Sequence, residues 1–261
     1  MTADLRTTYL GLELANPIVP SASPLGQRID TLRRLEDAGA AAVVLPSLFE
    51  EQIEHEELQI HGAFETGADS YAEALSYLPS FEDYNTGADV YLRHLEETKK
   101  ELSIPVIASL NGISIGGWTR YARRMQEAGA DALELNIYEV VTEPDQTASS
   151  VEGSMQQIVE DLKHELTIPI SVKLTPFFTA LANVARRLDR SGAAGLVLFN
   201  RFLQPDIDVS HMTVWPRLEL SNSSELLLRL RWAAILRGQL RASLAVSGGV
   251  STPSNFSTAN A

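Results

Sequence analysis

Lys173 is the residue whose type and position most clearly indicate chemistry. It lies in a run from Ile168 to Thr175 that is rich in β-branched residues and carries a proline at its start, which is typical of a buried strand. Alternation along a strand places Lys173 on the face opposite Val172 and Leu174. A buried ammonium group is costly unless it has a partner, so Lys173 is predicted to serve either a ligand site or a structural ion pair.

Glu134, on the preceding predicted strand, is the candidate partner for a structural ion pair. If the sheet closes into a barrel, Lys173 points into it near the carboxyl ends of the strands, where barrel enzymes keep their active sites. Asn136 ends the same strand in phase with Glu134, and Asn200 ends a later strand. Two amides and an ammonium group around one barrel mouth suit a planar heterocycle rich in carbonyl and ring-nitrogen groups.

Gly248 and Gly249 close the last apolar run of the chain. Such a pair is an ordinary turn in many proteins, but after a late barrel strand its backbone N–H groups can bind a phosphate. Taken with the amides and the lysine, the glycine pair predicts a phosphorylated ring cofactor, and flavin mononucleotide (FMN) fits best.

The elements that must position these residues alternate between strand and helix. Strands are predicted at residues 17–23, 41–48, 103–110, 132–137, 167–174, 195–201 and 244–250. Helices are predicted at residues 29–38, 90–102, 118–128, 150–166, 180–190 and 225–240. Residues 5–16 read as a hairpin with its turn near Gly11. Two stretches break the rhythm, an acidic segment at 50–89 with a helix-like start at 50–58, and an insertion at 202–222.

Sequence similarity within the chain supports a repeated β-α module. The segment from Glu101 to Pro105 closely matches the segment from Glu165 to Pro169. The pattern predicts an α/β fold, a TIM (β/α)₈ barrel with an N-terminal hairpin, as a single domain over residues 1–250. An eighth strand is not visible, and residues 251–261 form a polar tail. We therefore expect a chain truncated or frameshifted after Val250, with unpaired strand edges where the eighth βα unit is missing.

Composition narrows the class of protein. The 261 residues contain no cysteine and carry a formal net charge of −13. No thiolate metal site or cysteine nucleophile is possible, and nucleic acid or anionic lipid is disfavoured as a partner. No apolar run reaches the length of a membrane span, and the N-terminus lacks the features of a signal peptide, so a cytoplasmic protein is expected. The histidines lack metal-ligand spacing, and no metal is predicted.

The sequence resembles the dihydroorotate dehydrogenase family, especially its soluble class and the dihydroorotate dehydrogenase-like proteins. The resemblance runs from Leu10 to Val250. It is carried by residues 14–23, 129–136, 169–177 and 246–250, which read LANPIVPSAS, GADALELN, PISVKLTPF and VSGGV. It implies an FMN-binding barrel that takes a hydride from dihydroorotate or a dihydropyrimidine-like small molecule, and relatives that are often homodimers.

The resemblance also implies roles for individual residues. The residues expected to contact FMN are Ser21, Ala22, Asn111, Asn136, Lys173, Gly248 and Gly249. The residues expected to contact the substrate are Ser47, Asn136 and Asn200. Lys173 would stabilise reduced, anionic flavin. Relatives carry a Cys or Ser base after the strand-four asparagine, and here Glu139 stands at or next to that position, with Tyr138 as a weaker candidate.

Two other classes of function remain as alternatives. The first is a catalytically inactive barrel remnant, or a protein that only binds a partner, and retention of the cofactor would separate it from the enzyme. The second is a flavin barrel that modifies tRNA. The acidic composition, the missing cysteine and the lack of a basic region all disfavour the second alternative.

Overall fold

A six-stranded parallel sheet forms the centre of the fold. The computed structural model describes residues 4–49, 87–111, 115–137, 141–200, 204–217 and 221–252. The sheet order is β10-β7-β6-β5-β4-β3. Its strands are β3 (Val43–Phe49), β4 (Val106–Asn111), β5 (Ala132–Asn136), β6 (Ile170–Leu174), β7 (Gly195–Leu198) and β10 (Ser243–Val246). The predicted α/β class and six of the seven predicted strands are confirmed. Closure into a barrel stays a prediction, because no strand among the described residues pairs β3 with β10.

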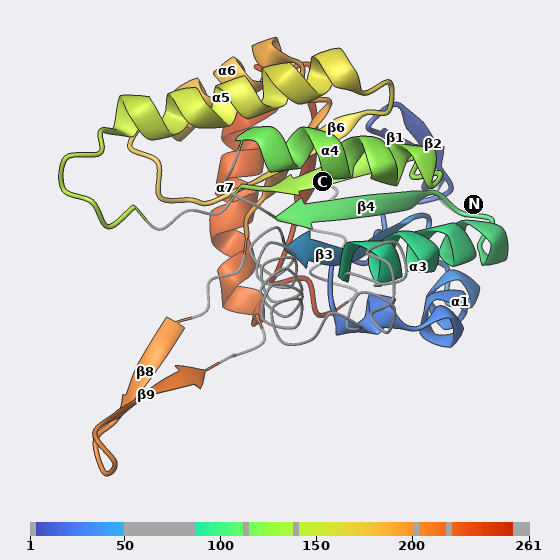
Figure 1. The fold of residues 1–261 in the computed structure, drawn as a ribbon, viewed down its shortest axis with the longest axis horizontal. Helices are drawn as coiled ribbons and strands as arrows, with labels where there is room; N and C mark the ends of the chain where they lie inside the picture. The colour runs from blue at the N-terminus through green and yellow to red at the C-terminus, as the bar shows by residue number, and fades with distance from the viewer. Residues whose placement is uncertain are drawn as a thin grey trace, which may run out of the picture.

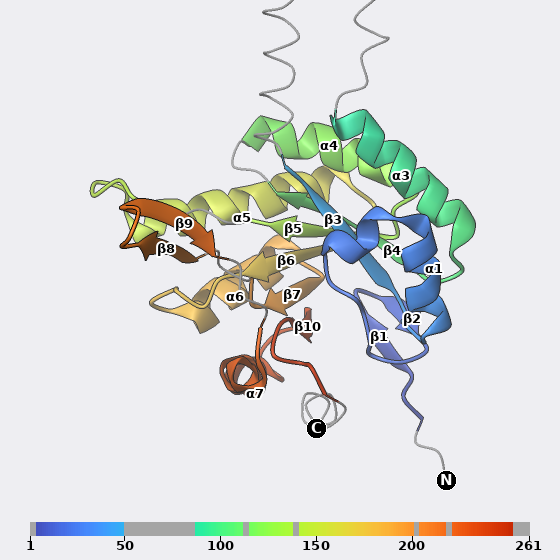
Figure 2. The ribbon, with the colours of Figure 1, turned by 90° about the horizontal axis from the view of Figure 1, so that it is seen from below.

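Helices alternate with these strands and cover one face of the sheet. They are α1 (Ile29–Asp37), α3 (Gly87–Glu101), α4 (Ile115–Glu127), α5 (Ala148–Glu165), α6 (Leu181–Ser191) and α7 (Leu226–Leu236). Figure 1 shows their order along the chain, and Figure 2 shows α3, α4 and α5 side by side along the sheet. The main apolar core, which includes Ile170, Val172 and Leu174, lies between helices and sheet. The alternate residues of each strand, including Lys173, therefore face the opposite side.

The N-terminal hairpin closes the amino end of that opposite face. Strands β1 (Thr7–Tyr9) and β2 (Leu12–Leu14) are joined by Leu10 and Gly11, both with positive φ, as a type I′ turn requires. Leu10 packs into a second apolar cluster beneath the sheet and donates its backbone N–H to Ser243 Oγ at 3.2 Å. A Cβ on Gly195 would lie 2.4 Å from Leu10 Cδ2, so the glycine makes room for the hairpin.

The prediction of a strand at residues 17–23 is wrong. This segment runs beside β3 without forming a ladder, and its backbone accepts hydrogen bonds from β3 and from the residues before β3. The carbonyls of Ile18 and Pro20 accept from Ala41 N at 2.9 Å and from Val44 N at 3.0 Å. Pro17 and Pro20 have no N–H group, so this segment lacks two of the donors that a regular strand would provide.

The repeated sequence produces the same junction twice. Leu102 and Leu166 are buried where α3 and α5 lead into β4 and β6. In the first copy Glu36 Oε1 accepts from Ser103 N at 2.9 Å, and in the second Gln126 Oε1 accepts from Thr167 N at 2.8 Å. The hydroxyl of Ser103 also donates to Glu36 Oε1, and this bond is the main reason that the pKa of Glu36 lies below its usual range. Side chains of α1 and α4 thus fix the segments that lead into β4 and β6 through the same contact.

The insertion at 202–222 contains a second hairpin that the sequence did not reveal. Strands β8 (Gln204–Asp208) and β9 (Thr213–Arg217) pair in an antiparallel ladder, and Figure 1 shows this hairpin extending away from the main sheet. The described part of the chain also contains two short 3₁₀ helices, η1 (Pro24–Gln27) and η4 (Ser223–Glu225). The segment at 50–86 and the tail at 253–261 lie outside the described residues. In the described part of the chain, none of the helices has the length and apolarity that crossing a membrane requires.

Candidate functional site

Asn111, Asn136 and Lys173 form one row across three adjacent strands. The register pairs Asn111 of β4 with Asn136 of β5, and Asn136 with Lys173 of β6. All three stand at the carboxyl ends of parallel strands, on the side of the sheet away from the main core. Of the three groups expected to converge, the register places Asn136 and Lys173 side by side and adds Asn111 to them, whereas Asn200 is not part of this row.

Lys173 forms a buried ion pair with Glu134. The distance from Nζ to Oε1 is 3.3 Å, and the two residues are 6% and 3% exposed. The partner named from the sequence is the one that the structure shows. A pair this deep is costly to desolvate, and a Lys–Glu pair adds little stability over an apolar core. The presence of a buried lysine at this position is therefore better explained by binding of a ligand than by a contribution to stability.

Asn136 carries a buried polar atom without a partner. Its Nδ2 donates weakly to Ser47 Oγ at 3.4 Å, and Ser47 Oγ lies 2.8 Å from Ser109 Oγ. Asn136 is 7% exposed, and within the part of the chain that the structure describes its Oδ1 accepts no hydrogen bond. An unpaired buried carbonyl costs about 1–3 kcal/mol, so Oδ1 is a ready acceptor for a ligand N–H group.

A bulge in β3 turns Ser47 toward this row. Val44 pairs with Ile107 and Ser47 with Ser109, so β3 contains one more residue than β4 over this stretch. Pro46 lies inside the bulge and cannot donate to a ladder. The N–H of Ser109 donates instead to the hydroxyl of Tyr91 on α3, at 2.9 Å. The sequence indicated Ser47 as a site residue but gave no sign of the bulge that orients it.

Two tyrosines lie close to Glu134, the half-buried Tyr9 and the buried Tyr91. Burial raises the pKa of Tyr9, and the negative charge of Glu134 raises it further, while a hydrogen bond with Ser171 opposes both effects. Burial also raises the pKa of Tyr91, a bond from the Ser109 backbone opposes this, and Glu134 adds a smaller increase. Both phenols therefore stay protonated at neutral pH. The polar interior combines one ion pair with neutral hydroxyl and amide groups.

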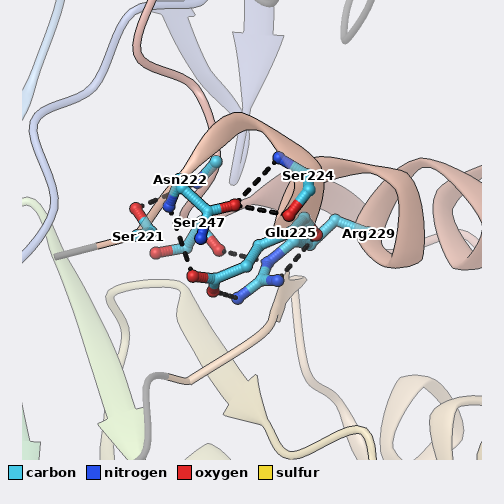
Figure 3. A network of polar contacts seen from close by, with 7 residues as sticks. Ser221, Asn222, Ser224, Glu225, Arg229 and Ser247 are labelled. Atoms are coloured by element: carbon cyan, nitrogen blue, oxygen red, sulfur yellow. Dashed lines mark hydrogen bonds and ion pairs between the residues drawn. The ribbon is translucent and has the colours of Figure 1, made fainter. Parts of the chain in front are cut away.

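Gly248 and Gly249 form a tight turn against the start of α7. Both have positive φ, at 89° and 82°, as the turn requires. A Cβ on Gly249 would lie 2.5 Å from the backbone nitrogen of Leu226. The N–H of Gly249 donates to Ser221 Oγ at 3.1 Å. Figure 3 shows the polar residues that hold this turn, which join η4, α7 and the end of β10.

Three of the remaining predicted residues can be placed from the structure. Asn200 follows β7 and donates its backbone N–H to Leu174 O at 2.7 Å, which places it beside the end of β6. Ala22 packs against the second apolar cluster, whereas Ser21 is exposed. Glu139 and Tyr138, the two candidates for the base, lie outside the described residues.

Tyr9, Tyr91, Ser109 and Arg229 belong to this region and were missed from the sequence. Arg229 had a readable signal, because it lies at helical spacing between Leu226 and Leu236 on the buried face of α7. Tyr9 and Tyr91 had none, since their hydroxyls reach the site from a separate hairpin and a helix. Among the described residues no group of three or more His, Asp or Glu side chains is placed to hold a metal ion.

The chain is similar in sequence to known proteins over most of its length. The sequence model of the protein family described as dihydroorotate dehydrogenase matches residues 4–214. The chain is 27% identical over 216 residues to the dihydroorotate dehydrogenase B (NAD(+)) catalytic subunit of Thermoplasma acidophilum, covering 79% of this chain and 65% of that protein. It is 29% identical to the same subunit of Methanocella arvoryzae, covering 80% of this chain and 65% of the relative.

A third relative has a different named activity. The chain is 26% identical to the NAD-dependent dihydropyrimidine dehydrogenase subunit PreA of Escherichia coli K12, with 77% of this chain and 49% of that protein covered. The chain thus spans about two thirds of the length of the first two relatives, and less of the third. All three names describe a subunit of a larger enzyme.

Proposed function

The chain belongs to the dihydroorotate dehydrogenase family, and from that premise we propose that it is an FMN-dependent oxidoreductase. The proposed reaction takes a hydride from a dihydropyrimidine-like ring. The observation that carries the proposal is the row of Asn111, Asn136 and Lys173, in which a buried ammonium group stands next to a buried carbonyl without a partner.

The residues present fit a flavin. The unpaired Oδ1 of Asn136 suits a ring N–H donor, and the ammonium group of Lys173 suits a ring that gains negative charge on reduction. The Gly248–Gly249 turn suits a phosphate, since glycine lets backbone approach closely. Ser21 and Ala22 would lie along the cofactor, and Ser47 and Asn200 would contact the substrate.

Flavin, when bound, supplies the acceptor for the hydride. The chain's own residues orient the reactants and hold charge. The ion pair with Glu134 would hold the Lys173 ammonium group beside the ring, and Tyr9 and Tyr91, whose pKa values are raised, add no negative charge at neutral pH. Glu139 is proposed as the base that removes the neighbouring proton, with Tyr138 as second candidate.

Replacing Asn136 with leucine is expected to separate stability from binding. The change removes the buried carbonyl without a partner, so the free energy of unfolding of the flavin-free protein should rise by about 1 kcal/mol. Affinity for flavin should fall at least tenfold, because the acceptor is gone. Chemical denaturation and flavin titration measure the two effects. A less stable variant with unchanged affinity would contradict the assignment of Asn136.

Reduction of bound flavin tests the reaction. The FMN-loaded chain is mixed anaerobically with dihydroorotate and, separately, with dihydrouracil, and the long-wavelength flavin absorbance is followed. Bleaching by either compound supports the enzyme and identifies its substrate. Flavin that stays bound and oxidised with both would contradict a dihydropyrimidine-like substrate.

The alternative is a catalytically inactive remnant or a partner-binding protein. The names of the relatives, which describe catalytic and other subunits, favour assembly with further chains, and a homodimer is also proposed. Sedimentation of the purified chain at several concentrations distinguishes a homodimer from a monomer that needs a different subunit.

A further inference from the structure

Arg229 is a buried arginine that lies against the Gly248–Gly249 turn. Its side chain is 8% exposed, although its helix α7 is otherwise apolar on the side that packs on the fold. A Cβ on Gly248 would lie 3.1 Å from Arg229 Nη2, so the guanidinium group is in contact with the turn itself. A buried guanidinium group is uncommon and needs compensation. Nothing in the proposed reaction so far uses this charge.

The contacts of Arg229 connect the end of β10 to the first turn of α7. Nε donates to the carbonyl of Ser247 at 2.8 Å, and Nη1 donates to the carbonyl of Glu225 at 2.7 Å. Nη2 lies 3.4 Å from Glu225 Oε2. Figure 3 shows the guanidinium group between these two segments. Because Ser247 immediately precedes the glycine pair, Arg229 fixes the point from which the turn begins.

Glu225 has two separable functions in this network. Its Oε1 accepts from Asn222 N at 3.2 Å, which completes a capping box at the start of η4 and α7. Its Oε2 is the counterion of Arg229. The capping box needs only an acceptor oxygen, which glutamine also provides. The pairing with Arg229 needs the negative charge.

We propose that the Arg229–Glu225 pair sets the affinity of the Gly248–Gly249 turn for the phosphate of the cofactor. Arg229 holds the turn in place and contributes positive charge beside it, and Glu225 offsets part of that charge. The inference rests on the proposed flavin function and deepens it. Arg229 is a positioning residue, since its donors are directed at Ser247 and Glu225. It acts on the phosphate through the turn and through its charge.

FMN and riboflavin differ only in the phosphate, so the ratio of their affinities isolates the effect of Arg229 and Glu225 on phosphate binding. Glu225→Gln keeps the capping box and removes the counterion. It is expected to bind FMN about tenfold more tightly, equivalent to about 1.4 kcal/mol, with unchanged affinity for riboflavin. Its melting temperature should nevertheless fall, because the buried guanidinium group of Arg229 loses the negative charge that lies opposite its Nη2. A less stable protein that binds FMN more tightly cannot be explained by damage to the fold.

Arg229→Met is expected to weaken FMN at least tenfold and to leave riboflavin nearly unchanged. Arg229→Lys keeps the charge and should retain more of the FMN affinity than methionine does. Glu152→Gln is the matched control, because Glu152 pairs with Arg187 at 3.0 Å on the helix layer. It changes the net charge equally and should not alter the ratio of FMN to riboflavin affinity.

The experiment is fluorescence titration of the full chain and its variants with FMN and with riboflavin, at low and moderate salt. The rise in melting temperature on adding inorganic phosphate alone gives a second measure of phosphate affinity. It can also be measured for variants whose stability is lowered. Equal effects on FMN and riboflavin, or weaker FMN binding by Glu225→Gln, would overturn the inference and leave the proposed function standing. If the unchanged chain binds neither flavin, the proposed function fails and this inference fails with it.

Discussion

Replacing Lys173 with methionine is expected to lower the free energy of unfolding by about 3–5 kcal/mol, because it leaves Glu134 buried and unpaired. The same change should hinder reduction of bound flavin, since no ammonium group remains beside the ring to stabilise the reduced form. Denaturant unfolding measures the first effect. The rate of anaerobic flavin bleaching measures the second.

Two further variants show whether the loss of stability arises from the unpaired charge of Glu134. The double variant Lys173→Met with Glu134→Gln should regain most of the lost stability but not the reduction of flavin. Lys99→Met removes a lysine from a pair with Asp131 at 2.6 Å whose side chains are 28% and 29% exposed, and should cost about 1 kcal/mol or less. Equal losses of stability for Lys173→Met and Lys99→Met would contradict the view that Glu134 becomes a costly buried charge without Lys173.

Replacing Gly249 with alanine is expected to cost about 3 kcal/mol or more and to abolish tight FMN binding. The new Cβ would lie 2.5 Å from the nitrogen of Leu226 and 2.9 Å from its Cα, which are backbone atoms that cannot turn away. The positive φ of 82° adds strain of about 1–2 kcal/mol. The turn must therefore move away from α7, and its N–H groups move with it. Thermal unfolding and flavin titration report the two effects.

Gly238 provides a matched control for the conformational strain. It also has positive φ, at 76°, but a Cβ there would have no neighbour within 4 Å. Gly238→Ala should cost only about 1–2 kcal/mol and leave FMN affinity unchanged. If Gly249→Ala behaved like Gly238→Ala in both measurements, the close approach of the turn to α7 would not matter for binding.

Much of the fold could be predicted because local periodicity determines its elements. The alternation around Val172 and Lys173 placed the lysine on the face away from the helices, and the structure confirms this. The matching segments that end at Pro105 and Pro169 predicted a repeated β-α module, and Glu36 and Gln126 bind these two segments in the same way. These features depend on residues close together in the sequence.

The features that the sequence did not reveal depend on contacts between distant residues. The predicted strand at residues 17–23 is irregular because Pro17 and Pro20 remove donors. The bulge at Pro46 is visible only from the register of β3 against β4. The hydroxyls of Tyr9 and Tyr91 reach the interior from separate elements, so periodicity could not place them. Barrel closure, the base at Glu139 and the roles of the FMN-binding residues stay predictions.

The most direct test of flavin binding is gel filtration of the purified full chain with excess FMN, followed by an absorbance spectrum of the protein peak. If the chain binds flavin as proposed, flavin elutes with compact protein in equal molar amounts, and its visible bands are shifted from those of free FMN. Compact protein that elutes without flavin would contradict the account. In that case the chain would be a barrel remnant without cofactor, and the buried pair of Lys173 and Glu134 would be purely structural.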